Sequence, residues 1–378
     1  ESSSLRSSST PASVKRHALV APLTIRIVMT LLDKDPVLSA EASPADATPA
    51  RRRPRLSLGR FTGVVIALAV VCVYLALTQP VFLSWGNITN IVASNSVILL
   101  LALGATFVII GGGFDLSSAS ALSATGMVLG LALQAGMPAW VAIASPILAG
   151  LVIGLVQGVL ISYVKISMIV VTLGFMSILA SFALIVNKGA TISVYGTPGF
   201  DPVYQFVNGS VGPIPLLMIF DAVVLLAAAF VLRYTAFGRS LFAMGSNPEA
   251  ARLNGINTAM MVLFVFLIAG LAAGLAGMVS VGRLTGAAAA SDPTLLMTAI
   301  AAVLIGGTAF TGGEGGVLGT VIGVLFLGVI QNGMTLSEIP AFWQGTVNGT
   351  ILILAVGIGV LRDRGIRLRR RAITTRVG

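Results

Sequence analysis

The chain has 378 residues, of which 56% are hydrophobic and only 10% are charged, and its formal net charge is +10. Charged residues make up about a quarter of ordinary soluble domains, so this composition excludes a water-soluble fold of this length. Residues 1–60 hold ten Lys or Arg against five Asp or Glu, and residues 362–378 hold seven against one. Residues 61–361 are nearly neutral, which excludes a basic nucleic-acid-binding domain and predicts a protein that crosses the membrane several times.

The first 60 residues are rich in Ser, Ala, Pro and Arg and lack a sustained apolar period, which predicts a disordered basic tail. A signal peptide is not expected there, because Pro22 and Arg26 interrupt its apolar stretch. Residues 362–378 predict a second basic tail after a membrane domain over 61–361.

The membrane domain contains about ten apolar stretches, and about 20 apolar residues are needed for one transmembrane helix. We therefore expect an all-α polytopic protein. An even number of spans places both basic termini on one side, which the positive-inside rule assigns to the cytoplasm. Close helix contacts are expected where glycines recur every four residues, as over 150–158 and 270–274. The expected spans are 61–79, 88–110, 116–135, 138–163, 167–186, 213–232, 258–281, 294–310, 317–333 and 343–361.

The longest polar stretch on the expected cytoplasmic side covers residues 233–257. Its second half predicts a short helix: Ser246 or Asn247 can cap it, Pro248 suits its first position, and Gly255 can end it. Such a short helix is marginal alone in water, so we expect it to lie against the membrane domain or another protein.

Four motifs follow one another along residues 87–361. The first, GGFDLS, contains Gly112, Gly113, Asp115 and Ser117, and the second is VVTLGFMS at 170–177. The third is the 233–257 loop, and the fourth covers 299–319 with Gly306, Gly307, Gly312 and Gly313, followed by Gln331-Asn332-Gly333. In this order they resemble the permeases of bacterial ATP-binding-cassette sugar transporters of the ribose/xylose/galactose type. Asp221 departs from that family, whose corresponding span is usually apolar.

The resemblance implies the permease subunit of an importer for a monosaccharide or related polyol in the bacterial inner membrane, and not an enzyme. The implied partners are a separate ATPase subunit, an extracytoplasmic sugar-binding protein, a second permease copy in a homodimer or heterodimer, and lipid. The chain has no P-loop motif, so ATP-Mg is expected only on the ATPase, with no cofactor or metal here. The residues expected to couple to the ATPase are Gly238, Arg239, Asn247, Glu249, Ala250, Ala251, Arg252 and Gly255.

The solute path is expected where apolar helices are interrupted by glycine, because freed backbone must face protein or water. Two such segments, 103–120 and 298–315, are offset by 195 residues and suggest an internal repeat. Amide and hydroxyl side chains suit a sugar, although each has the alternative role of bonding one helix to another. The candidates are Asn90, Asn95, Thr106, Thr172, Gln331 and Asn332.

Three other functions were weighed from the residues. The main alternative is an ion-coupled secondary transporter of a small neutral solute, which usually needs acidic residues in several spans, whereas Asp221 is nearly alone. An intramembrane enzyme lacks chemistry here, because the only histidine is His17 in the tail and the only cysteine is Cys72. A channel gives no reason for a capped helix in the 233–257 loop.

Overall fold

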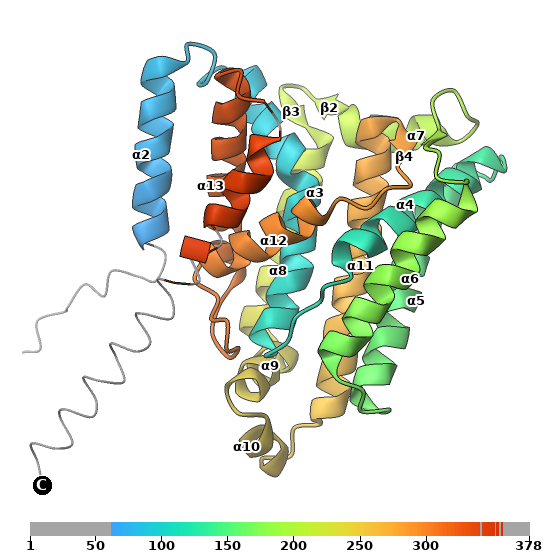
Figure 1. Ribbon diagram of the computed structural model, residues 1–378, viewed down its shortest axis with the longest axis vertical. Coiled ribbons are helices and arrows are strands. Elements are labelled where there is room, and N and C mark those ends of the chain that lie inside the picture. The colour runs from blue at the N-terminus through green and yellow to red at the C-terminus, as the bar shows by residue number, and fades with distance from the viewer. Residues whose placement is uncertain (1–61, 341, 352, 355–356, 358–378) are drawn as a thin grey trace, which may run out of the picture. The chain divides into compact units, whose positions relative to one another are not determined.

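The computed structural model describes residues 62–340, 342–351, 353–354 and 357. The tails expected at 1–60 and 362–378 lie outside the described residues, as does the end of the last expected span. The described chain is mainly helical, and its helices follow the apolar stretches of the sequence (Figure 1). The long helices are α2 (Thr62–Thr78), α3 (Trp85–Ile110), α4 (Ser118–Gln134), α5 (Ala139–Ser162), α6 (Met168–Val186), α8 (Leu216–Tyr234), α11 (Thr258–Leu284), α12 (Pro293–Ile305) and α13 (Val317–Leu336).

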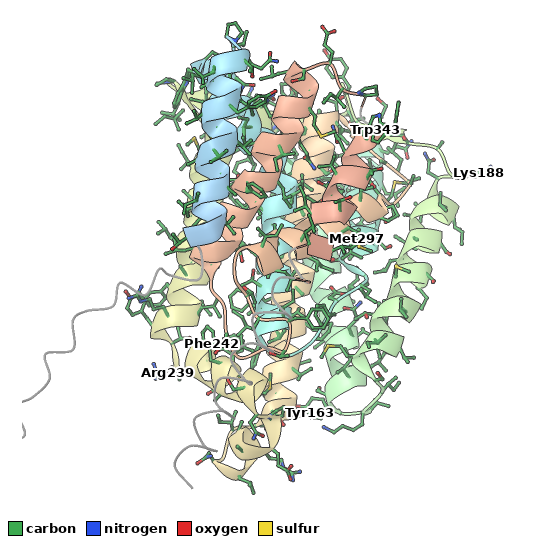
Figure 2. The ribbon with its side chains drawn as sticks, turned by 60° about the vertical axis from the view of Figure 1, so that its left-hand side comes forward. Tyr163, Lys188, Arg239, Phe242, Met297 and Trp343 are labelled. Atoms are coloured by element: carbon green, nitrogen blue, oxygen red, sulfur yellow. The ribbon has the colours of Figure 1, made fainter. Side chains whose placement is uncertain are left out.

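Shorter elements lie at the two ends of these helices (Figure 1). One end, called the α10 end below, carries α9 (Ala236–Ser246) and α10 (Pro248–Leu253). The opposite α7 end carries α7 (Phe200–Asn208) and two antiparallel pairs of short strands, β1 with β4 and β2 with β3. Figure 2 shows Arg239 and Tyr163 at the α10 end and Lys188 toward the α7 end. The strands are β1 (Ile192–Ser193), β2 (Ser210–Val211), β3 (Ile214–Pro215) and β4 (Gly286–Ala287).

Six helices, α3, α5, α6, α8, α11 and α13, are long and apolar enough to cross a membrane. α2, α4 and α12 are apolar but shorter. The expected span 294–310 is wrong at its C-terminal end, because α12 stops at Ile305 and glycines 306 and 307 follow. Its 13 residues cover only about 20 Å of a hydrocarbon core about 30 Å thick. The protein is thus a polytopic membrane protein in which α12, by length, is too short to cross the membrane on its own.

The helix α3 lies at the centre of the fold, whereas α5, α6 and α8 leave most of their residues uncovered. α5 and α11 pack through glycine, as the four-residue spacing predicts. A Cβ on Gly150 would overlap the carbonyl oxygen of Gly270, and one on Gly154 would overlap that of Phe266. The two helix backbones therefore touch directly, which is how helices associate where lipid supplies no hydrophobic drive.

Candidate functional site

The 233–257 loop folds into two helices with well-defined ends. Asn247 caps α10, because its side-chain oxygen accepts hydrogen bonds from the backbone N–H groups of Glu249 and Ala250 at 3.1 and 3.0 Å. Pro248 occupies the first turn. Gly255 follows α10 with φ +82°, a left-handed conformation that favours glycine. The sequence predicted this helix, but it did not predict α9, whose cap is Thr235.

The two faces of α10 differ sharply. Ala251 is buried, and it packs in an apolar cluster with Leu241 and Met244 of α9 and Met261 of α11. Leu253, on the same helix, is 79% exposed. The helix is therefore fixed to its own membrane domain through Ala251, while an apolar side chain is left open at the α10 end.

The other residues expected to couple to an ATPase divide between these two environments. Gly238 is buried in the first turn of α9, where its N–H donates to the Thr235 hydroxyl at 3.2 Å. The exposed positions are Arg239, Asn247, Glu249, Ala250, Arg252 and Gly255. Four of these exposed residues are polar or charged, and three of the four, Asn247, Glu249 and Arg252, belong to α10 or its cap, on the same short segment as Leu253.

Three chain segments meet at the C-terminal end of α9 through glycines. The N–H of Gly313 donates to the carbonyl oxygen of Ile110 at 2.8 Å. A Cβ on Gly245 would overlap that same oxygen, and one on Gly312 would lie 2.7 Å from Cα of Gly112. We call this contact between the end of α3, the end of α9 and the loop before α13 the glycine junction.

The two glycine-interrupted segments have the same backbone conformation, as the 195-residue offset predicts. α3 ends at Gly111 and α12 ends at Gly306, and the next residues, Gly112 and Gly307, have φ +86° and +87°. Equivalent backbone hydrogen bonds close both helix ends, at 2.9 to 3.2 Å. The loops also touch, since the rings of Phe114 and Phe310 have centroids 4.6 Å apart.

Asp115 and Ser117 organise the start of α4. The Asp115 carboxylate accepts from the N–H of Ser117 at 2.8 Å and from its hydroxyl at 2.6 Å. Ser117 in turn accepts from the amide of Gln157 on α5 at 2.7 Å. Burial raises the pKa of the Asp115 carboxyl, and the two hydrogen bonds from Ser117 act in the opposite direction. These contacts give Asp115 a structural role.

Four of the six candidate path residues have partners within the protein. Asn332 and Asn87 exchange two hydrogen bonds, at 2.8 and 3.1 Å, between α13 and α3. The hydroxyls of Thr106 and Thr320 lie 2.7 Å apart and join the same helices. Asn95 and Thr172 are buried, and each bonds to a carbonyl oxygen of its own helix. These side chains hold helices in place in this conformation.

The remaining two candidates are more open. Asn90 is exposed on the first turns of α3, and Gln331 is half-buried on α13. A further polar contact lies near Asn90, where Arg283 of α11 donates to Ser94 at 3.2 Å. Neither the helix breaks nor the motifs of the sequence indicated this contact. The charge of Arg283 also acts on Asp221, for which the sequence suggested no basic partner. Residues 221 and 283 are 62 positions apart on different helices, so spacing along the chain gave no signal.

Residues 87–356 match the family model described as the branched-chain amino acid transport system / permease component. The probable ABC transporter permease protein y4mJ of Sinorhizobium fredii is 36% identical over 334 residues, which cover 87% of this chain and 98% of that protein. No solved structure matches the chain.

Two further relatives carry more specific names. The ribose import permease protein RbsC of Escherichia coli K12 is 34% identical over 292 residues, covering 77% of this chain and 91% of the relative. The L-arabinose ABC transporter permease protein AraH of Azospirillum brasilense is 33% identical over 339 residues, covering 89% and 98%. The chain is accordingly a transport subunit and not an enzyme, and it binds no cofactor of its own. It belongs to the branched-chain amino acid transport system / permease component family.

Proposed function

We propose that this chain is the membrane-spanning permease of an ATP-driven importer, and that it carries a monosaccharide delivered by an extracytoplasmic binding protein. Relatives named for ribose, L-arabinose, D-allose and galactose import support the class of solute. The relatives named as ABC transporter permeases favour ATP-driven transport over the ion-coupled alternative. The protein is placed in the bacterial inner membrane.

The α10 end is proposed to face the cytoplasm, with both termini on that side and about ten spans. The charges support this orientation, because Lys165, Arg233, Arg239 and Arg252 belong to segments at the α10 end. The segments at the α7 end carry Asp201, Asp292 and Glu338 together with Lys188 and Arg283, so acidic residues outnumber basic ones there, whereas the four basic residues of the α10 end outnumber Asp115, Glu249 and Glu314. A second copy of the permease is expected to complete the path.

One observation carries the coupling role: α10 is capped, anchored by buried Ala251, and yet presents Leu253 with 79% of its surface exposed. An isolated six-residue helix is unstable, so its order comes from this anchoring. We expect Leu253 and its polar surroundings to enter a cleft of the ATPase subunit. Apolar side chains of this kind, enclosed by polar ones, are typical of the centre of protein interfaces.

Co-purification tests this role directly. The permease is expressed with its cognate ATPase and binding protein, and the ATPase recovered with the permease is measured together with uptake of labelled sugar. Leu253→Asp should abolish both, because a carboxylate must then be desolvated in the interface. Tyr163→Asp, at an exposed position of the same end, is the control and should keep both. Recovery of the ATPase with Leu253→Asp at the wild-type level would contradict the coupling role.

A second substitution separates docking from folding. Ala251→Trp places a large side chain where α10 packs on its own domain, so α10 should be displaced and transport lost while the permease still inserts. Proton-driven uptake by the purified permease without any ATPase would overturn the proposed function as a whole.

A further inference from the structure

A polar network joins three helices near the α7 end, outside the coupling region. The guanidinium of Arg283 on α11 donates to the hydroxyl of Ser94 on α3 at 3.2 Å. That hydroxyl donates to the side-chain oxygen of Asn90, also at 3.2 Å. Asp221 on α8 accepts from the hydroxyl of Ser96 on α3 at 2.7 Å. Side chains from α3, α8 and α11 therefore bring two opposite charges to one place.

Each charged member of the network keeps an unused polar atom. Asp221 is 3% exposed, and its Oδ2 atom has no hydrogen-bond partner among the described residues. The Nη1 atom of Arg283 is also buried and without a partner in the described part of the chain. The opposite charges of Arg283 and Asp221 attract each other, although these two atoms do not bond to one another.

The open side of this network cannot face lipid. The 26 residues of α3 measure about 39 Å, so a centred helix extends about 4–5 Å beyond each side of a core about 30 Å thick. Ser94 lies nine residues into α3, about 14 Å from its start and hence about 9 Å inside the core. Ser94 and Asn90 are nevertheless exposed, and Arg283 is half-buried. Lipid cannot bond to exposed hydroxyl, amide and guanidinium groups, so water must reach them.

We propose that Arg283, Ser94 and Asn90 form a hydroxyl-binding site at the outer end of the transport path, and that Asp221 is the positioning residue for Arg283. This inference rests on the proposed function, because it describes the same path and places the α7 end outside. The site offers N–H donors from Arg283 and Asn90 and a hydroxyl from Ser94. The negative charge of Asp221 near Arg283 lowers the net charge of the site, which suits a neutral polyhydroxylated solute better than an ion.

Cysteine labelling tests whether water reaches this face. In a Cys72→Ser background, Ser94→Cys is exposed from outside to a charged methanethiosulfonate that does not cross membranes. Because reaction requires a hydrated thiolate, we expect labelling at least about tenfold faster than at the control, Val223→Cys. Val223 is 59% exposed and lies at a similar depth in α8. Equal, slow labelling at both positions would show that protein or lipid covers the site and would overturn the proposal.

The same cysteine reports the position of the guanidinium. A positive charge next to Ser94→Cys favours an anionic sulfonate reagent over a cationic trimethylammonium reagent, by about tenfold in the ratio of their rates. Arg283→Gln should abolish this preference. Asp221→Asn removes a negative charge, which by itself would increase the preference, so a decrease in this variant shows that Arg283 has left its position. Asp221→Glu should keep the preference of the wild type. A preference unchanged or increased in Asp221→Asn would refute the positioning role.

Sugar uptake tests the binding role with the complete transporter. D-ribose is the first probe, followed by D-allose, L-arabinose and D-galactose, each with the ATPase and binding protein present. Relative to the wild type, Arg283→Gln should lower uptake by at least about tenfold. Lys188→Gln, which removes an exposed charge at the same end, should not lower it. Uptake unchanged in Arg283→Gln would overturn the site. A wild type that imports none of these sugars would instead contradict the proposed function, while the labelling pattern would still test the site.

Discussion

Substitution of Gly245 tests whether the 233–257 loop is coupled to the solute path through the glycine junction. This residue lies where α9 meets the ends of the two glycine-interrupted segments. A Cβ added there would overlap the Ile110 carbonyl oxygen and lie 2.6 Å from the Gly313 nitrogen, whereas ordinary van der Waals contact begins at 3.4 Å. The α9 backbone must therefore retreat by about 0.8 Å or more. Overpacking of this kind costs about 1–3 kcal/mol. The hydrogen bond from Gly313 to Ile110 is worth about 1 kcal/mol more.

The expected consequence of Gly245→Ala is a permease that still binds its ATPase but transports poorly. A penalty of about 2–4 kcal/mol reduces the population of the closed junction roughly 30- to 900-fold. Because α10 keeps its own cap and its exposed Leu253, ATPase binding should persist. ATP hydrolysis and sugar uptake are measured together in proteoliposomes, and uptake per ATP hydrolysed should fall at least about tenfold.

Two matched glycine substitutions control this experiment. Gly174 in α6 and Gly86 in α3 have nothing within 4 Å of an added Cβ, so alanine at either position should leave uptake unchanged. If Gly245→Ala imported sugar within twofold of the wild type at the same ATP consumption, the glycine junction would have no part in coupling. Loss of ATPase binding in Gly245→Ala would refute the expectation that the ATPase binds α10 independently of the glycine junction.

Three further substitutions follow from the contacts described above. Asn247→Ala removes the cap of α10 and should cost about 1 kcal/mol, with reduced uptake, whereas Asn247→Asp keeps an acceptor and should retain it. Gly154→Leu forces α5 from α11 and should lower the midpoint of thermal unfolding in detergent or prevent folding, while Gly174→Leu, on an open face, should not. Thr106→Val breaks the hydrogen bond to Thr320, which is worth about 0.6 kcal/mol. The double variant Thr106→Val/Thr320→Val should lose less free energy of unfolding than the two single variants lose in sum, and strictly additive losses would argue against the pairing.

Local signals in the sequence predicted local structure well. The Asn-Pro pair and the later glycine defined α10 to within a residue, because capping and left-handed backbone depend on neighbouring residues only. The 195-residue offset predicted two helix ends of the same conformation for the same reason. The glycine spacing likewise identified a face for close packing on each of α5 and α11, since small residues every four positions lie on one helix face, but it did not indicate that these two faces meet.

Contacts between distant helices were not predictable in this way. An amide in an apolar span is equally compatible with a path and with another helix, and only the fold shows that Asn95 is buried and that Asn332 bonds to Asn87 on another helix. The pairing of Asp221 with Arg283 depends on how α8 and α11 pack around α3, which no spacing records. The expected span 294–310 ran past the end of α12 at Ile305, although the glycines at 306 and 307 already indicated an interruption in this segment.

The direct backbone contact between α5 and α11 has a mechanical consequence. Because no side chains separate the two backbones at Gly150 and Gly154, we expect a displacement of α11 to displace α5 with it. Four residues separate the end of α10 from the start of α11, which carries Arg283 in its last turn, about 40 Å away. A tilt of α10 by the ATPase would therefore displace the guanidinium at the far end of this lever, with no need for a chain of intermediate side-chain changes. One helix pair could connect nucleotide turnover on one side of the membrane with release of the solute's hydroxyls on the other.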